Sequence, residues 1–202
     1  NRPGKIVCSG RNYREHAKEL GNDVPVDPLF FLKPSTSVIG DGDAILLPPQ
    51  SERVEFEGEI GIVIGSTLTK AREEETAAAI RGVVALNDVT ARDLQKKDSQ
   101  WTRAKGFDSF CPIGGMATSF GDLASLTVVT RVNGQERQRG SANEMVFSIP
   151  MLLSYVSHVM TLEPGDVVAT GTPSGVGPLN DGDTVEVEIV GLSKVSNIVR
   201  LP

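Results

Sequence analysis

Three glutamates occupy alternate positions in the stretch Val54–Gly65, which reads VEFEGEIGIVIG. Alternate side chains of an extended strand share one face, so Glu55, Glu57 and Glu59 are expected to point together. The apolar run that follows predicts a strand entering a core, where unpaired carboxylates are costly. A divalent ion such as Mg²⁺, Mn²⁺ or Ca²⁺ would compensate these charges, because such ions prefer oxygen ligands. The alternative is a solvated edge on which each glutamate pairs with Arg or Lys.

A second polar segment follows the apolar run Val83–Leu86. Asp88 comes at the end of this predicted strand and could supply a third carboxylate to an ion held by Glu57 and Glu59. The residues that follow add a guanidinium, an amide and an amine, which suit an anionic, oxygen-rich substrate. These residues are Arg92, Gln95 and Lys105. A surface pair between the arginine and Asp93 is the alternative.

The chain has two histidines, which differ in their neighbours. His16 and Glu19 are three residues apart on a predicted helix over Tyr13–Leu20, so they share a face. The carboxylate could orient the imidazole and raise its basicity, as an acid/base pair requires. A solvent-facing helix pair is the alternative. His158, near the end of a predicted helix, is expected to be a partner of the helix dipole or a surface residue.

A glycine-rich segment, GTPSGVG at residues 171–177, precedes the C-terminal strands. It lacks the lysine of a phosphate-binding loop and the spacing of a dinucleotide fingerprint, so a nucleotide site is not expected. Its glycines would bring backbone N–H groups and the Thr172 hydroxyl close to a ligand carboxylate.

Length and composition predict one globular domain over residues 1–202. The net charge of −6 and the lack of a basic cluster argue against nucleic acid or an anionic membrane as a partner. No apolar run approaches the ~20 residues of a membrane span, and no signal-peptide core is found, so we expect a cytoplasmic protein. The chain begins at Asn1 rather than Met, as a trimmed N-terminus would. Cys8 and Cys111 lie in apolar surroundings and are expected to be buried, reduced thiols.

The remaining patterns predict a β-rich chain with few helices. Asn133-Gly134 between two strand-like runs is typical of a type I′ hairpin turn. Two alternating segments, Thr184–Ile189 and Val195–Leu201, predict a second hairpin at the C-terminus. The composition of Thr69–Arg81 predicts the clearest helix of the chain, with Thr69 as its N-cap.

Six segments together, in this order and across nearly the whole chain, resemble the fumarylacetoacetate hydrolase family. They are GRNYREHAKELG, FFLKPST, VEFEGEIGIVIG, NDVTARDLQ, WTRAKGFDSFCPIG and GDVVATGTPSGVGPLNDGD. The resemblance implies an α+β fold that is mainly β, a mixed β-sandwich roll with a few short helices and an N-terminal lid helix. It also implies a homodimer and an active-site Mg²⁺ or Mn²⁺, with Ca²⁺ as a further ion of the same ligand preference.

By the same resemblance, Glu57, Glu59 and Asp88 correspond to the metal ligands. Glu55 lies outside the family's paired glutamates, so we expect it to support the ligands from behind or to form a surface pair.

The resemblance also assigns the residues around the ion. Residues 10–24 correspond to a mobile lid that orders over the substrate and carries the catalytic dyad of His16 and Glu19. Lys105 and Gln95 resemble the polar residues of the pocket, and Thr172 lies in the substrate-facing glycine-rich loop. Arg92 is expected to contact the anionic substrate.

These residues predict an enzyme that cleaves a C–C bond in an acylpyruvate, a 2,4-dioxo acid. His16, held by Glu19, would take a proton from water for attack on the distal carbonyl, while Lys105 stabilises anionic oxygens. The same site could instead decarboxylate or isomerise a diacid of the oxaloacetate or 2-hydroxyhepta-2,4-diene-1,7-dioate type. The short KKDSQ segment resembles the isomerase group of the family. A noncatalytic module that binds 2-oxo acids is the third reading.

Overall fold

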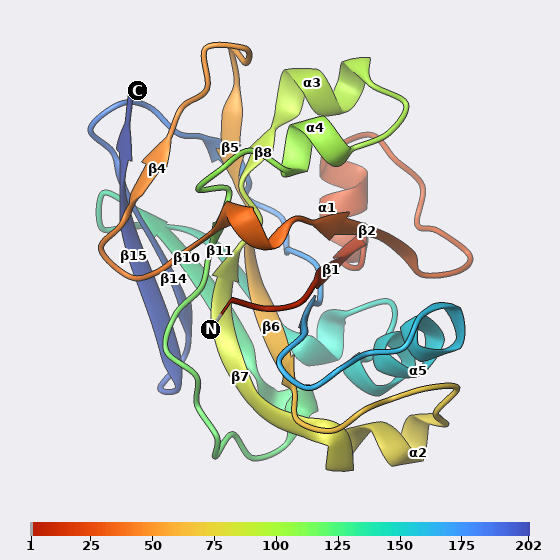
Figure 1. The fold of residues 1–202 in the computed structure, drawn as a ribbon. Helices are drawn as coiled ribbons and strands as arrows, with labels where there is room; N and C mark the ends of the chain where they lie inside the picture. The colour runs from red at the N-terminus through yellow and green to blue at the C-terminus, as the bar shows by residue number, and fades with distance from the viewer. Residues whose placement is uncertain (1) are drawn as a thin grey trace.

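Strands make up most of the regular structure in the computed structural model, which describes residues 2–202 (Figure 1). The first of two five-stranded sheets has the order β2-β1-β12-β6-β7. Its strands are β1 Ile6–Gly10, β2 Leu29–Lys33, β6 Gly58–Ile64, β7 Ile80–Asn87 and β12 Val167–Ala169. Strands β1 and β12 are parallel, and the other neighbours in this sheet are antiparallel.

The second five-stranded sheet has the order β11-β10-β14-β15-β4. Its strands are β4 Ala44–Leu46, β10 Thr127–Val132, β11 Gln135–Ser141, β14 Thr184–Ile189 and β15 Ser193–Arg200. Both predicted hairpins are confirmed, since β10 pairs with β11 and β14 pairs with β15. Asn133 and Gly134 have φ values of 51° and 76°, the left-handed conformation that a type I′ turn requires at both positions.

Short elements complete the fold. Two small sheets join β13 Gly177–Pro178, β5 Val54–Phe56 and β8 Thr90–Ala91, and β3 Val38–Ile39 with β9 Cys111–Pro112. The α-helices are α1 Arg14–Glu19, α2 Glu73–Thr76, α3 Arg92–Lys97, α4 Thr102–Lys105 and α5 Ile149–Val159. Single 3₁₀ turns cover Ser35–Ser37, Ala77–Ala79, Leu123–Ser125 and Ala142–Glu144. None of the helices in the described part of the chain has the length and apolarity needed to cross a bilayer.

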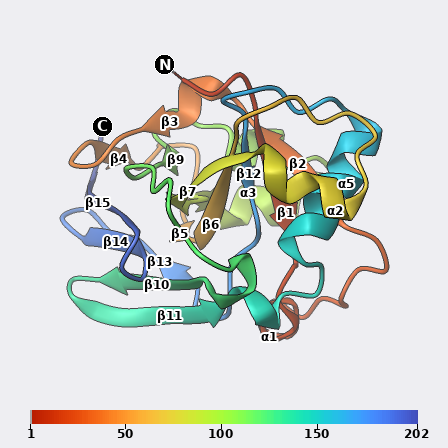
Figure 2. The ribbon, with the colours of Figure 1, turned by 90° about the horizontal axis from the view of Figure 1, so that it is seen from below.

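The largest apolar core lies where the two five-stranded sheets meet, with β6 and β7 in contact with β10, β14 and β15 (Figure 2). Ile60, Ile62 and Ile64 are fully buried in it because alternate residues of β6 face the same way. Helix α5 adds Leu153 and Val156 to this core. Strand β6, which carries Glu59, is therefore packed in this core from Ile60 onward.

The acidic stretch forms two strands, so the prediction of a single strand is wrong. Strand β5 pairs with β8 and β13, whereas β6 pairs with β12 and β7. Glu57 is the residue between them, where the Asn87 side chain accepts a hydrogen bond from the Glu57 N–H at 3.0 Å. The chain changes sheets at this point, which period-two patterning cannot reveal.

The predicted helix over Thr69–Arg81 is also wrong in extent. Only Glu73–Thr76 is α-helical, one 3₁₀ turn follows, and Ile80 already pairs with Ile64 in the β6–β7 ladder. Thr69 does not cap the helix, because its hydroxyl contacts that of Thr161 and Arg72 occupies the N-cap position. The pairing that begins at Ile80 ends the helix, despite the high helix propensity of Ala77–Ala79.

Candidate metal centre and cavity

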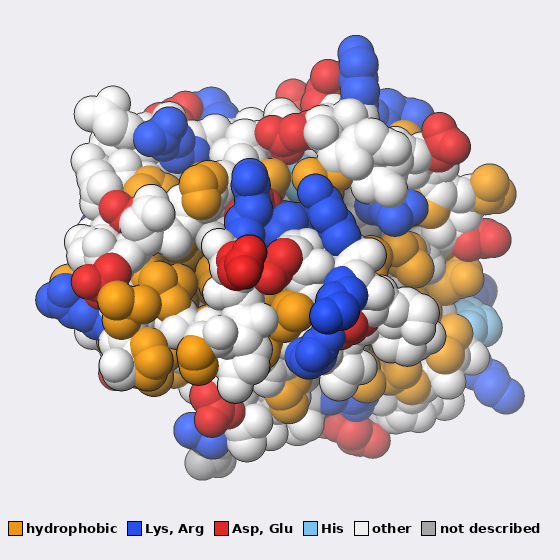
Figure 3. Space-filling view, turned by 90° about the horizontal axis from the view of Figure 1, so that it is seen from above, with side chains coloured by type: hydrophobic (Ala, Val, Ile, Leu, Met, Phe, Trp, Pro, Cys, Tyr) orange, Lys and Arg blue, Asp and Glu red, His pale blue; other side chains and the backbone are white. Residues whose placement is uncertain are grey.

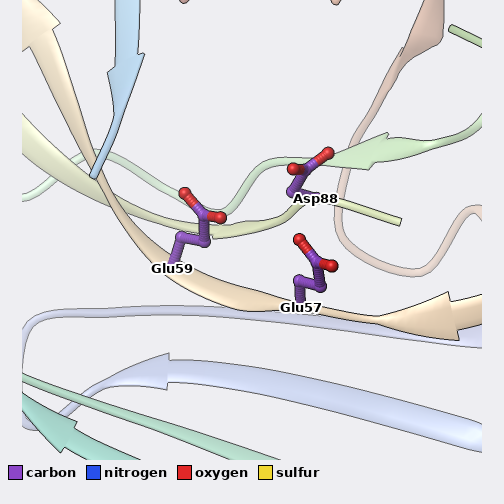
Figure 4. Close-up of side chains that lie close together, drawn as sticks. All are labelled: Glu57, Glu59 and Asp88. Atoms are coloured by element: carbon purple, nitrogen blue, oxygen red, sulfur yellow. The ribbon is translucent and has the colours of Figure 1, made fainter. Parts of the chain in front are cut away.

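Three carboxylates from two segments converge at one end of the β6–β7 pair, as Figure 4 shows. Glu57 precedes β6, Glu59 is the second residue of β6, and Asp88 follows β7 directly. The antiparallel register places Gly58 opposite Asn87, so the start of one strand lies beside the end of the other. One oxygen atom from each carboxylate lies within 4.8 Å of the others, and each residue is at most 5% exposed.

Two of these carboxylates are already neutralised by buried cations. The Lys105 Nζ lies 2.8 Å from Glu57 Oε2 and 2.6 Å from Asp88 Oδ2, so it bridges the two acids. Arg92 Nη2 donates to Glu57 Oε1 at 2.5 Å. Lys33 Nζ donates to Asp88 Oδ1 at 2.6 Å.

Glu59 differs from its neighbours. Within residues 2–202 it forms no ion pair, and its Oε2 accepts one hydrogen bond, from the Gly171 N–H at 2.8 Å. Burial raises the pKa of the Glu59 carboxyl well above its usual range, and the charges of Asp88 and Glu57 raise it further. A buried carboxylate without a cation, beside two others, is a donor set that fits a hard divalent ion.

The pKa values of Glu57 and Lys105, unlike that of Glu59, are shifted in the direction that favours the charged form. Burial would raise the pKa of Glu57, but Lys105 and Arg92 outweigh it and lower that pKa below the usual range. Burial would lower the pKa of Lys105, but Asp88 and Glu57 outweigh it and raise that pKa. Glu57 and Lys105 therefore remain charged through the neutral range.

Arg92 belongs to the carboxylate cluster in this structure. Its Nε donates to Glu55 Oε2 at 2.6 Å and its Nη1 to Gln95 Oε1 at 2.5 Å, in addition to the contact with Glu57. Glu55 also pairs with the half-exposed Arg53 at 2.6 Å. Glu55 is thus a buried residue linked to Glu57 through Arg92, and its role in supporting a metal ligand stays a prediction. Contact of Arg92 and Gln95 with a substrate stays a prediction.

Helix α1 brings His16 to the cavity and places Glu19 beside it. His16 Nδ1 lies 3.3 Å from Glu19 Oε2, and the histidine is only 4% exposed. The Gly175 N–H donates to both oxygens of Glu19, at 3.0 and 3.2 Å, which ties the helix to the glycine-rich loop. The surface-pair alternative is wrong for His16, which is buried. Tyr13 occupies the N-cap position of this helix, and the side chain of Asn12 bonds the backbone of Phe147 and Thr170.

A cavity of about 210 Å³ adjoins these groups. Its wall includes every predicted site residue except Asp88 and Glu19. Arg11, Lys96 and Trp101 also line it. On the face drawn in Figure 3, Lys and Arg side chains gather near the middle, next to acidic side chains. Phe31 forms part of the wall, with the Trp101 ring edge-on at 5.3 Å and Lys105 Nζ 4.9 Å from its centroid. The cavity therefore combines positive charge with an aromatic wall.

Two further predictions concern hydroxyl and imidazole groups. The Thr172 hydroxyl donates to Gly58 O at 2.8 Å and accepts from Gln138 Nε2 at 2.7 Å, so its first role is to hold the loop. Its contact with substrate stays a prediction. His158 lies exposed in the last turn of α5 with Nδ1 2.9 Å from Ser154 O, as expected for a residue outside the site.

The sequence interpretation missed two buried partners of the cluster. Lys33 ends the apolar block FFLK, and a lysine at the end of such a run was the available signal. Asn87 precedes Asp88, and its side chain fixes the Glu57 backbone. Nothing in its own type or spacing distinguishes it from a turn residue.

The comparisons with known proteins agree with this geometry. A family profile described as fumarylacetoacetate (FAA) hydrolase C-terminal matches residues 5–200. The chain belongs to the fumarylacetoacetate hydrolase family. A mitochondrial oxaloacetate decarboxylase of Dictyostelium discoideum is 43% identical over 198 residues, 93% of this chain and 89% of that protein. A mitochondrial oxaloacetate tautomerase of Homo sapiens is 39% identical over 203 residues, 98% of this chain and 92% of that protein.

Solved structures of the family superpose closely. A 2-hydroxyhepta-2,4-diene-1,7-dioate isomerase from Mycobacterium marinum has a TM-score of 0.90 at 42% identity, covering 98% of this chain and 75% of that one. A fumarylpyruvate hydrolase from Pseudomonas aeruginosa, in complex with Mn²⁺ and pyruvate, has a TM-score of 0.92 at 31% identity, covering 98% and 90%. The mixed fold with most strands in several sheets is therefore that of the fumarylacetoacetate hydrolase family.

Replacing Glu59 by Gln should have opposite effects on the stability of the metal-free protein and on its affinity for Mn²⁺. Without metal, Glu59→Gln should raise the melting temperature, by about 2–4 °C for each 1 kcal/mol gained, because the Glu59 carboxyl must either bury an uncompensated charge or take up a proton on folding, and the amide does neither. Loss of a residue that only hydrogen-bonds a metal ligand weakens metal binding by roughly 10–100-fold. Because Glu59 is assigned as a ligand itself, Glu59→Gln should weaken Mn²⁺ binding by more than that. Calorimetric titration and thermal melts with and without Mn²⁺ measure both effects.

Glu188→Gln is the matched control for this substitution. Glu188 is a strand glutamate whose Oε2 pairs with Arg131 at 2.8 Å on the surface. Its loss should leave Mn²⁺ affinity unchanged. Equal Mn²⁺ binding by both variants would contradict the assignment of Glu59 as a ligand.

Proposed function

We propose that this chain is a divalent-metal-dependent enzyme that acts on a 2-oxo diacid of the oxaloacetate type through its enol or enolate form. The observation that carries the proposal is the convergence of Glu57, Glu59 and Asp88 beside a cavity that also receives His16. Relatives about 40% identical over nearly the whole chain are an oxaloacetate decarboxylase and an oxaloacetate tautomerase, which supports this substrate class.

Glu57, Glu59 and Asp88 would hold the ion, Mg²⁺ or Mn²⁺. The ion supplies a Lewis acid that lowers the energy of negative charge on the carboxylate and keto oxygens of a 2-oxo acid. The Mn²⁺ and pyruvate bound to the related fumarylpyruvate hydrolase support a site that accepts both an ion and a 2-oxo acid. Lys105, which bridges Glu57 and Asp88, stays protonated and adds a second positive charge next to the reacting oxygens.

His16 would carry the proton. Glu19 engages its Nδ1, which leaves Nε2 as the ring nitrogen for proton transfer. In tautomerisation, His16 removes a proton from C3 of the keto diacid, and the C2 oxygen gains one. In decarboxylation, the C3–C4 bond breaks, the C4 carboxylate leaves as CO₂, and the electron pair forms the enolate of pyruvate. His16, protonated from solvent, then donates a proton to C3 of that enolate, which gives pyruvate.

Hydrolysis of an acylpyruvate is the second candidate, because the buried His16, paired with Glu19, could equally activate water. His16 would take a proton from water, hydroxide would add to the distal carbonyl, and the C–C bond would break with the enolate of pyruvate as leaving group. Protonation of that enolate yields pyruvate and a carboxylic acid. A related enzyme of this type, 31% identical, supports this reading.

A substrate panel decides among these reactions. With Mg²⁺ or Mn²⁺ present, oxaloacetate should be interconverted between enol and keto forms or converted to pyruvate and CO₂, and chelation should abolish the activity. Enol absorbance and proton NMR of the products, with acetylpyruvate and a hydroxy-diene diacid in parallel, distinguish the outcomes. Acetate and pyruvate from acetylpyruvate alone would favour the hydrolase. Tight 2-oxo acid binding without any conversion would mean a binding module.

His16→Ala should lower kcat by about 10²- to 10⁴-fold, the usual contribution of a positioned acid or base. Mn²⁺ affinity should stay within about twofold, because His16 is not among the clustered carboxylates. Lys18→Ala, an exposed change on the same helix, should keep wild-type turnover. Full turnover by His16→Ala would remove the dyad from the mechanism.

Lys96→Ala should raise KM for oxaloacetate by about fivefold, the equivalent of a solvent-exposed ion pair of about 1 kcal/mol. Lys96 lines the cavity on α3, where it could attract the second carboxylate of a diacid. KM for a monoacid such as acetylpyruvate should not change. Lys97→Ala removes a neighbouring exposed charge that does not line the cavity, so its kinetics should match the wild type. Equal KM changes for both acids would refute a distal carboxylate contact.

A further inference from the structure

Gln138 is a buried amide on β11 with no assigned role, and it lies behind the metal centre. It is 1% exposed. Its Nε2 donates to Thr172 Oγ1 at 2.7 Å and to Pro173 O at 2.8 Å, and its Oε1 accepts from the Gly58 N–H at 3.0 Å. One side chain thus connects the start of β6 with the glycine-rich loop.

The Gly58 peptide unit is held from both sides by this arrangement. Its N–H is bound by Gln138, and its carbonyl accepts from the Thr172 hydroxyl at 2.8 Å. Because Gln138 also bonds Thr172, the three groups form a closed ring of hydrogen bonds. A side chain at Gly58 would place its Cβ 1.9 Å from Thr130 Oγ1, so only glycine allows this close approach.

Gly58 separates Glu57 from Glu59, the two ligands contributed by this segment. The loop that Gln138 holds also supplies the Gly171 N–H to Glu59. On the opposite side, Asn87 holds the Glu57 N–H and the Asp88 N–H donates to Glu57 O at 2.8 Å. A shift of Gly58 would therefore move both glutamate carboxylates relative to Asp88.

We propose that Gln138 is a positioning residue for the metal centre, which fixes the separation of the Glu57 and Glu59 carboxylates through the Gly58 backbone. This inference rests on the proposed function, because it concerns the same ion. Groups that orient metal ligands from outside contribute about 10–100-fold to metal affinity. Gln138 acts one step further back, on the backbone that carries the ligands, and it touches neither substrate nor ion.

Gln138→Met tests the proposal, because methionine has a similar length and makes none of the three hydrogen bonds. Calorimetric titration with Mn²⁺ alone should show affinity about 10-fold or more weaker than in the wild type. The rise in melting temperature on adding saturating Mn²⁺ should shrink accordingly. Wild-type Mn²⁺ affinity in a folded Gln138→Met protein would overturn the proposal.

Asn197→Leu controls for general destabilisation. Asn197 is an equally buried amide, 2% exposed, that donates to Gly40 O and Asp43 O at 2.8 and 2.9 Å in the second sheet. Its loss should lower the metal-free melting temperature as Gln138→Met does. Mn²⁺ affinity should remain at the wild-type value. If Asn197→Leu weakens Mn²⁺ binding as much, the effect is only structural and the proposal fails.

Thr172 provides a second test that does not depend on the folding of Gln138→Met. Thr172→Val removes the hydroxyl that links Gln138 to the Gly58 carbonyl, whereas Thr172→Ser keeps it. Valine should weaken Mn²⁺ binding and serine should not. The double variant Gln138→Met/Thr172→Val should lose little more than the weaker-binding single variant, because both act on one peptide unit. If the losses of Mn²⁺ affinity in the two single variants simply add in the double variant, Gln138 and Thr172 act independently and the proposed ring of hydrogen bonds is refuted. A wild-type protein that binds no Mn²⁺ would refute the proposed function instead.

Discussion

The burial of several carboxylates at one point constrains the whole structure. Four negative and three positive side chains lie together in the interior, so one negative charge is left. These side chains are Glu55, Glu57, Glu59, Asp88, Lys33, Arg92 and Lys105. Removing a charge from water costs several kcal/mol unless a partner compensates it. The cationic residues satisfy three of the acids, and the deficit falls on Glu59, which faces the cavity. That imbalance supports the proposal of a divalent cation at this site.

The backbone holds this arrangement in place against the repulsion of like charges. The acidic stretch changes sheets at Glu57, and Gly58 is clamped by Gln138 and Thr172. Strand β6 pairs with β12 and β7 and packs against the second sheet, which limits the separation of the carboxylates. Burial of the isoleucines of β6 stabilises the fold, and this stability offsets the repulsion among the carboxylates at the start of the same strand.

The cavity is assembled from segments with different functions. The helix with His16 and Glu19 is tied to the glycine-rich loop through Gly175, so the group proposed to move protons is connected to the loop that contacts Glu59. Phe31 and Trp101 form one wall, and the cationic residues Arg11 and Lys96 also line the cavity. These two cations could attract an anionic substrate toward the carboxylate cluster.

The sequence by itself determined the residue types of the site and most of the strands. Alternation and turn residues predicted both hairpins, and the spacing of His16 and Glu19 predicted their contact, because each depends on neighbours in the chain. Only the tertiary structure decided where the acidic stretch changes sheets and that Ile80 and Arg81 belong to a strand rather than a helix, because strand pairing overrode local preference. It also brought Lys33 to the Asp88 carboxylate, and Asn87 and Gln138 to the backbone of Glu57 and Gly58. Local periodicity carries no information about such partners, since burial and charge balance act between residues that are close only after folding.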